Sequence, residues 1–264
     1  MNKFGIDDNG FIITEVSVDK ITPQHKTIVD EVLSAIVEKL TSQIGGIYLY
    51  GSVATGKAIE GKSDLDILIV LKETPDKSLS EEIKSLESTL SEKYEPMLRG
   101  VGLTVTSIPE VTSEKERYGY MCYIKHLCVC VYGNDITKDT LSFTPSKEIA
   151  KGFNGDITEV LKSYKDKIEK STSELELKKL SQEVSKKIVR TGFSLVMPRS
   201  GSWSTDLQSS FDTFVYYYPE KAKDMNVALE WARGCFSDKA SVVEFMEVFG
   251  KWLSEEFERE ILMK

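Results

Sequence analysis

The sequence is poor in the residues that build metal clusters and disulfide frameworks. Its 264 residues include four cysteines and two histidines, and no two cysteines have the C-x-x-C spacing of zinc ligands. Reduced and mostly buried thiols are therefore expected. Apolar runs are also short: the longest, 67–71 and 127–132, fall far below the roughly 20 residues needed to cross a bilayer. Because no apolar leader follows the N-terminus, we expect a cytoplasmic protein without a membrane span.

Positive charge is in deficit as well. The chain has 34 lysines and arginines against 42 acidic residues, a formal net charge of −8. Such a surface repels polyanions and anionic lipid, so a nucleic-acid partner is not expected. With 41% hydrophobic and 29% charged residues the composition is that of a globular protein, and the length suits two domains of ordinary size.

The two halves of the chain differ in their hydrophobic pattern. Up to about residue 142, helical spacing over 23–43 and 79–94 alternates with strand-like segments at 47–50, 63–71 and 101–107. Beyond it, long amphipathic stretches at 157–170, 175–196, 205–218, 220–233 and 242–263 predict helices. We therefore expect an α+β protein with a mixed α/β domain at 1–142 and an all-α helical bundle at 143–264.

One segment between two predicted strands combines residues that suit phosphate chemistry. It contains Gly51-Ser52, Gly56 and Ser63, followed directly by Asp64-x-Asp66. Strand side chains repeat with a period of two, so both aspartates project from one face and can share a divalent cation; such oxygen ligands suit Mg²⁺. Gly51-Ser52 comes where a helix is expected to start, and free backbone N–H groups at such a position bind phosphate. The segment predicts a site for a nucleoside triphosphate and its metal.

These residues closely resemble the signature of the polymerase-beta-like nucleotidyltransferase superfamily, and the resemblance covers roughly residues 25 to 135. It implies a small mixed sheet flanked by helices. It also implies nucleotide binding at Gly51, Ser52 and Ser63, with Asp64 and Asp66 as catalytic residues and Mg²⁺ ligands.

The second half looks like the helical domain of small bacterial antibiotic-modifying nucleotidyltransferases, such as the aminoglycoside nucleotidyltransferases. The stretches 190–195, 203–207 and 217–220 carry this likeness. It implies an acceptor in the cleft between the domains and cationic residues of the helical domain that reach the triphosphate. Lys187 and Arg190 are the candidates, although lysines in such numbers are more often the solvated face of a helix.

The pattern departs from the family at the third carboxylate, which active members carry on a later strand. Here Gly102 takes that place, and Thr104 and Thr106, next on the same face, carry no charge. Three sources of a general base stay open: Glu95 or Glu110 at the ends of the strand, Asp206 in the helical half, or the acceptor itself. Asp206 also suits a helix cap.

Two other residues have competing interpretations. His126 is expected to be structural rather than catalytic. Trp203 follows a Gly/Ser-rich turn, where it either stacks on an acceptor ring or fills the bundle core.

The function these observations predict is Mg²⁺-dependent transfer of a nucleoside monophosphate, AMP from ATP, to a hydroxyl of a small molecule or a protein. The alternative is a catalytically degenerate nucleotide-binding protein that acts as a sensor or as the partner of another protein. A structural domain that binds no nucleotide is the third possibility, and the complete Gly51-Ser52 and Asp64-x-Asp66 pattern disfavours it.

Overall fold

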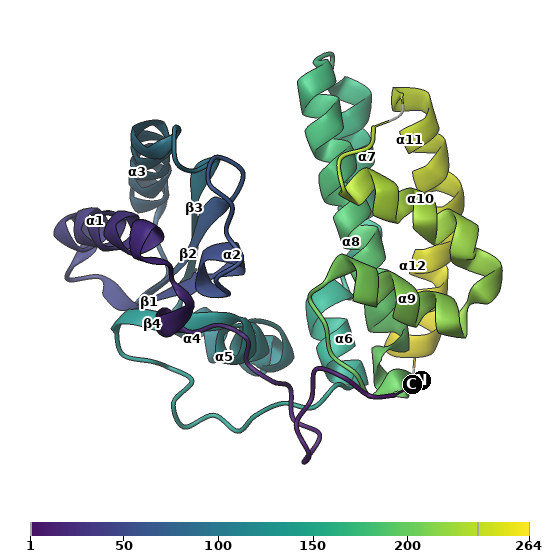
Figure 1. The fold of residues 1–264 in the computed structure, drawn as a ribbon, viewed down its shortest axis with the longest axis horizontal. Helices are drawn as coiled ribbons and strands as arrows, with labels where there is room; N and C mark the ends of the chain where they lie inside the picture. Colours follow the sequence, from purple (N-terminus) through teal and green to yellow (C-terminus); the bar gives the residue numbers. More distant parts are fainter. Residues whose placement is uncertain (1, 237, 264) are drawn as a thin grey trace. The chain divides into compact units, whose positions relative to one another are not determined.

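The computed structural model describes residues 2–236 and 238–263, and the chain divides into two compact units (Figure 1). The sheet unit comprises residues 13–142. The helical unit comprises the chain from residue 143 onward together with the N-terminal residues up to Ile12.

The N-terminal segment therefore differs from the expected domain over 1–142, because its contacts are with the helical unit. The Trp203 N–H donates to the Phe4 carbonyl at 2.9 Å, and the Ile12 N–H donates to the Phe143 carbonyl at 2.8 Å. Gly5 has a φ of +69°, and a Cβ built there would lie 2.0 Å from the Trp203 carbonyl oxygen. Only glycine permits this approach of the two backbones.

The sheet unit is built on four strands, β1 (Ile44–Tyr50), β2 (Asp64–Leu71), β3 (Gly100–Ser107) and β4 (Cys128–Gly133). Their order in the sheet is β3-β2-β1-β4. Strand β1 is antiparallel to β2 and to β4, whereas β2 and β3 are parallel. A parallel pair needs a crossover connection, which α3 (Lys77–Tyr94) provides. The expected small mixed sheet flanked by helices is confirmed.

Each face of the sheet has its own hydrophobic core. Ile47, Leu49 and Ile67 point to the face covered by α1 (Pro23–Leu40) and α3. Tyr48 and Leu68 point to the other face, where they pack with α5 (Cys122–Leu127) and the turns before it. Because strand side chains alternate, the even-numbered residues of β2 continue along this second face to the start of the strand. Asp64 and Asp66 therefore lie on the face that α5 covers further along.

The helical unit is arranged around α8 (Glu174–Ser200), which contacts α6 (Lys147–Asn154), α7 (Ile157–Lys170), α9 (Leu207–Tyr217) and α10 (Ala222–Ala232). Residues of α8 from Ile188 to Met197 are almost all buried, and the helix ends at Gly201 in the left-handed conformation. The helix expected over 242–263 consists of α11 (Lys239–Phe245) and α12 (Lys251–Phe257) with wider π turns after each of them.

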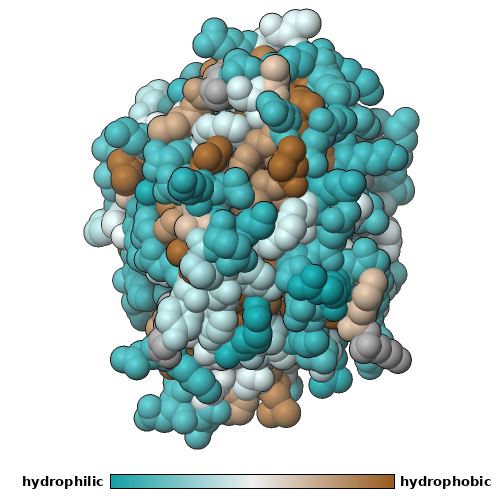
Figure 2. All heavy atoms as spheres, turned by 90° about the vertical axis from the view of Figure 1, so that its right-hand side faces the viewer, coloured by the Kyte–Doolittle hydropathy of each residue, from teal (hydrophilic) through white to brown (hydrophobic). Residues whose placement is uncertain are grey.

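Hydrophilic side chains cover most of the face drawn in Figure 2, with hydrophobic residues in small groups between them. This is the surface expected of amphipathic helices that bury one side. Within the described ranges no helix has the length and apolar character needed to cross a membrane.

Candidate nucleotide and metal site

The two aspartates of the motif lie at the start of β2, on one face of the sheet. In the parallel register with β3, Asp64 pairs with Gly100 and Asp66 pairs with Gly102. Across the antiparallel pair with β1, Asp66 is opposite Tyr50, the last residue of that strand. Residues that pair directly across strands share a face, so the carboxylates project on the side of Gly102 and Tyr50.

Gly51 brings the backbone after β1 directly against Asp66. Its φ is +73°, and a Cβ built on it would lie 2.3 Å from Asp66 Oδ2. The chain turns there from β1 into the short helix α2 (Gly51–Ala54). A side chain at this position would displace the carboxylate, so glycine serves here both the turn and the close approach.

Two serines of the motif frame the loop between α2 and β2. The Ser52 carbonyl accepts a hydrogen bond from the Lys57 N–H at 2.9 Å. Ser63 Oγ accepts from the Ile59 N–H at 2.9 Å, and the Ser63 N–H donates to the Ile59 carbonyl at 2.9 Å. In the structure, Ser63 therefore fastens the loop that leads into Asp64.

An arginine that the motif does not include binds the first aspartate. Arg99 Nε donates to Asp64 Oδ1 at 2.9 Å, and Arg99 Nη2 forms an ion pair with Asp64 Oδ2. The only signal for this contact in the sequence is that Arg99 precedes the strand residue that pairs with Asp64. That signal becomes readable only when the β2–β3 register is known.

The second aspartate is in a different electrostatic position. Burial raises the pKa of the Asp66 carboxyl to about 6, and the nearby Asp64 charge acts in the same direction, whereas Arg99 opposes them. Because this carboxylate is costly to ionise, a cation bound beside it would stabilise its ionised form. This favours Asp66 as a cation ligand.

The third carboxylate is missing from the face where the expected register requires it. Gly102 is opposite Asp66, and a Cβ built on it would lie 3.6 Å from Asp66 Oδ1, an ordinary contact. The next residue on that face, Thr104, is engaged with Tyr50, with 3.0 Å between the two hydroxyl oxygens. Among residues 2–236 and 238–263, no three His, Cys, Asp or Glu side chains are placed to hold a metal ion.

The donor set nevertheless suits one Mg²⁺ bound together with phosphates. Two neighbouring carboxylates supply hard oxygen ligands, and Mg²⁺ in nucleotide sites completes its shell with water and phosphate oxygens. The position of Asp66 between Gly51 and Gly102 leaves its carboxylate without a bulky neighbour on those two sides. The residues present fit a cation that arrives with its nucleotide, and they do not form an all-protein cage.

Two of the three alternative bases on the chain, Glu110 and Asp206, are engaged in hydrogen bonds of their own. Glu110 accepts a hydrogen bond from Thr106 Oγ1 at 2.8 Å, and Thr106 is four residues beyond Gly102, about 13 Å along the strand. Glu95 follows α3 and is exposed. Asp206 caps α9 by accepting from the Ser209 N–H at 2.8 Å, which is the cap role considered for it.

The two cationic candidates are on α8 of the helical unit. Lys187 Nζ donates to Asp156 Oδ1 at 2.7 Å and to the Phe153 carbonyl at 3.1 Å, so within its unit it ties α8 to the end of α6. Arg190, one turn later, is exposed.

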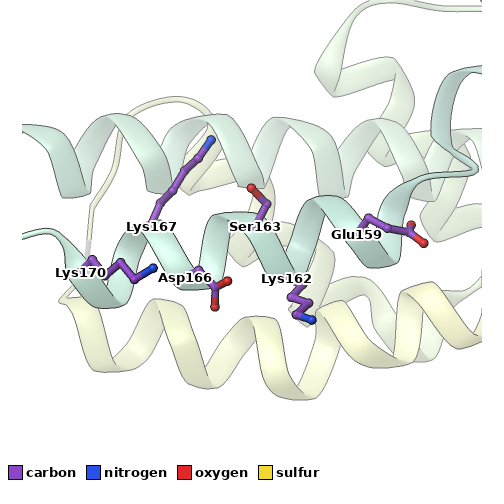
Figure 3. A pocket seen from close by; sticks show the side chains of 6 residues that line it. All are labelled: Glu159, Lys162, Ser163, Asp166, Lys167 and Lys170. Atoms are coloured by element: carbon purple, nitrogen blue, oxygen red, sulfur yellow. The ribbon is translucent and has the colours of Figure 1, made fainter.

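Three lysines of α7 line a shallow hollow along that helix (Figure 3). Acidic side chains alternate with them, and all six lining residues are on α7: Glu159, Lys162, Ser163, Asp166, Lys167 and Lys170. Figure 3 shows the side chains spread along the helix surface rather than turned toward one point. This is the mixed-charge pattern of a solvated helix face.

His126 and Trp203 are both buried parts of the fold. His126 Nδ1 lies 3.3 Å from Thr14 Oγ1, and burial lowers the pKa of its imidazole to about 4. Trp203 packs edge-on against Phe153 with 5.6 Å between ring centroids. The core interpretation of Trp203 fits this packing.

Comparisons with known proteins agree with the family resemblance. The model of a family described as "Nucleotidyltransferase domain" matches residues 29–192, more than half of the chain. A solved structure of spectinomycin adenyltransferase AAD(9) from Enterococcus faecialis, with ATP and spectinomycin, is similar with a TM-score of 0.58. The similarity covers 88% of this chain and 99% of that chain at 14% sequence identity, which shows a shared fold. No curated protein sequence matches.

Proposed function

The chain belongs to the nucleotidyltransferase domain family, and we propose that it transfers AMP from ATP to a hydroxyl group of an acceptor, with Mg²⁺ at Asp64 and Asp66. One observation carries this proposal: the Asp66 carboxylate lies against Gly51, at the turn that follows β1. That contact joins the expected phosphate-binding turn to the expected metal ligand in a single site.

Each residue of the site has a role in this proposal. Asp64 and Asp66 hold the metal, and bound Mg²⁺ would neutralise phosphate charge that grows as the leaving group departs. The backbone N–H groups at Gly51 and Ser52 hold the terminal phosphates. Ser63 keeps the loop before β2 in place through its bonds to Ile59. Transfer of this kind depends on positioning and electrostatic stabilisation more than on covalent help.

The reaction would proceed by in-line attack of the acceptor hydroxyl oxygen on the α-phosphorus. A new oxygen–phosphorus bond forms, the bond from the α-phosphorus to the bridging oxygen breaks, and pyrophosphate leaves. The hydroxyl proton goes to a base, which we leave unassigned because Gly102 stands where the family has its acid. Lys187 and Arg190 remain proposed contacts of the triphosphate.

The acceptor is proposed to be a small molecule or a protein. The similar adenyltransferase was crystallised with ATP and the small molecule spectinomycin, and this supports a nucleotide and an acceptor of moderate size here. The net charge of −8 disfavours a polynucleotide acceptor.

A second function is favoured by the glycine opposite Asp66. A protein that binds nucleotide without transferring it would need Asp64, Asp66 and Gly51 but no third acid, and Gly102 supplies none. Such a protein would act as a sensor or as the partner of another protein. The two functions share the binding site and differ only in turnover.

Thermal unfolding with each nucleoside triphosphate, with and without Mg²⁺, tests the shared site. A ligand at about 100 times its Kd adds roughly 2.7 kcal/mol to the stability of the folded state. We expect Mg²⁺ with ATP to stabilise the natural protein and not an Asp64→Asn, Asp66→Asn variant. Asp30→Asn, which removes an exposed carboxylate of α1, is the matched control. Absence of any shift in the natural protein would exclude both functions.

Restoring the acid separates transfer from binding alone. Gly102→Asp adds a carboxylate next to Asp66, and Gly102→Asn adds the same shape without the charge. If the natural protein is degenerate, metal-dependent pyrophosphate release appears in Gly102→Asp and not in Gly102→Asn. Release by the natural protein itself supports the transferase and a base outside β3.

A further inference from the structure

The strongest feature that the motif does not explain is the Arg99–Asp64 ion pair. The guanidinium contacts both carboxylate oxygens, through Nε at 2.9 Å and through Nη2. Two parallel donors on one carboxylate fix its orientation as well as its charge, and arginine is the side chain whose planar fork allows this. One of the two expected metal ligands is thus already paired with a cation of the chain.

The strand partner of Asp64 leaves room for this pair. Asp64 is opposite Gly100, and a Cβ built on Gly100 would lie 3.7 Å from Asp64 Oδ1. A larger residue there would cover the carboxylate on that side. Arg99, the preceding residue, instead folds its side chain onto Asp64 and remains about 60% exposed.

Asp66 has the opposite surroundings. Within the part of the chain that the structure describes, Arg99 forms its ion pair with Asp64 and not with Asp66. Gly51 and Gly102 place no side chain beside the Asp66 oxygens, and its partner on the β1 side is Tyr50. Of the two carboxylates, Asp66 is therefore the one whose oxygens are not held by the Arg99 guanidinium.

A pair of metal ions requires more negative ligands than this site has. Two divalent cations in a nucleotide site are usually held by several carboxylates and the phosphates together. Here two carboxylates face one guanidinium, which leaves a net charge of −1, and position 102 adds none.

We propose that the Arg99 guanidinium takes the place of a second metal ion: it holds Asp64, and it leaves Asp66 to bind a single divalent cation that arrives with the nucleotide. The inference rests on the proposed nucleotide site and revises its metal ligands: Asp64 pairs with Arg99, and Asp66 is the carboxylate that binds the cation. Arg99 is then a positioning residue that sets how many metal ions the site accepts.

The test counts bound Mn²⁺ in the presence of a non-hydrolysable ATP analogue, from the electron paramagnetic resonance signal of free Mn²⁺. We expect about one Mn²⁺ per bound nucleotide in the natural protein and about two in Arg99→Met, because Asp64 is then free to take a second ion. Arg99→Lys keeps the positive charge and is expected to stay at about one. Lys62→Met removes an exposed positive charge from the loop before β2, and it controls for the effect of losing one positive charge near the site.

The outcomes separate this inference from the function on which it rests. Two Mn²⁺ per nucleotide in the natural protein would overturn it while leaving nucleotide binding intact. One Mn²⁺ in both the natural protein and Arg99→Met would also overturn it, since Arg99 would then not be what limits the site. Failure of the natural protein to bind the analogue would instead refute the proposed function. Circular dichroism of each variant checks that the fold is retained.

Discussion

The close approach of Gly51 to Asp66 leads to a prediction whose magnitude can be divided into two parts. In Gly51→Ala, a residue with a side chain must adopt a φ of +73°, which costs about 1–2 kcal/mol. The added Cβ would also start 2.3 Å from Asp66 Oδ2, so the carboxylate or the turn must move by about 1 Å, at a further cost of about 1–3 kcal/mol by analogy with overpacked sites. We expect a total loss of about 2–5 kcal/mol.

Gly61→Ala isolates the backbone part of that cost. Gly61 has a φ of +67°, but a Cβ built on it meets nothing within 4 Å. It belongs to the loop of the same site, so its replacement is expected to cost about 1–2 kcal/mol and no more. Introducing Asp66→Ala beside Gly51→Ala removes the collision, because only the Asp66 Cβ remains, 3.5 Å from the added atom.

The assay has to report on the sheet unit alone. All three tryptophans, Trp203, Trp231 and Trp252, belong to the helical unit, so their fluorescence does not follow the site. Hydrogen exchange of peptides from β1 and β2 measures the local opening free energy instead. If Gly51→Ala costs no more than Gly61→Ala, or the same with and without Asp66→Ala, the contact does not have the energetic role argued for it.

Three further predictions concern charge and packing. The folded-state pKa of Asp66 is raised to about 6. The protonated carboxyl therefore favours the folded protein below about pH 4, and this contribution to stability is lost as the pH rises through 6. Asp66→Asn should stabilise the metal-free protein at pH 7.5 and not at pH 4. Asp64→Asn, which breaks an exposed ion pair, should instead destabilise by at most about 1 kcal/mol at pH 7.5; hydrogen exchange of β2 at the two pH values checks both signs. Ser181→Ala removes a buried hydroxyl of α8 that has no hydrogen-bond partner among the described residues, and it should stabilise by about 0.5–1 kcal/mol. Ser194→Ala on the same helix removes the acceptor of the buried Asn154 side-chain amide, and it should lower the free energy of unfolding by about 1–3 kcal/mol. Tryptophan fluorescence in urea measures both serine variants. Gly192→Ala places a Cβ 2.3 Å from the terminal methyl of Met225 in α10, and overpacking should lower the free energy of unfolding by about 1–3 kcal/mol. An unchanged urea midpoint would show that the Met225 side chain moves aside without cost.

Local patterns predict most of the sheet and of the helices. The alternation of Asp64, Asp66 and Leu68 with buried neighbours follows from a strand covered on both faces, and the helical period of α8 follows from its burial on several sides. The resemblance places Gly102 where the family has its third acid, and in the regular parallel pair of β2 and β3 this residue is opposite Asp66. Hydrophobic periodicity is therefore sufficient to predict a helix or strand where one element packs on another.

Contacts between distant segments carry no such signal. The hydrogen bond from the Trp203 N–H to the Phe4 carbonyl joins residues about two hundred positions apart, and the segment around Phe4 has no hydrophobic period that would predict it. The Arg99–Asp64 pair depends on the register of two strands that are separated by a helix. Both contacts became visible only when the backbone brought the partners together.

The missing acid and the remaining contacts have different consequences for binding and for turnover. The backbone at Gly102 is paired as a regular strand, and a Cβ there would make only an ordinary 3.6 Å contact with Asp66 Oδ1, so what is lost there is a side chain rather than the site. The Asp66 carboxylate, raised in pKa by its burial, is stabilised by any cation that occupies that space. Cation and nucleotide binding should therefore increase the stability of the sheet unit, whichever of the two functions holds. Only the proton of the attacking hydroxyl lacks an assigned acceptor, so the transferase and the binding protein differ in whether a base outside β3 accepts that proton.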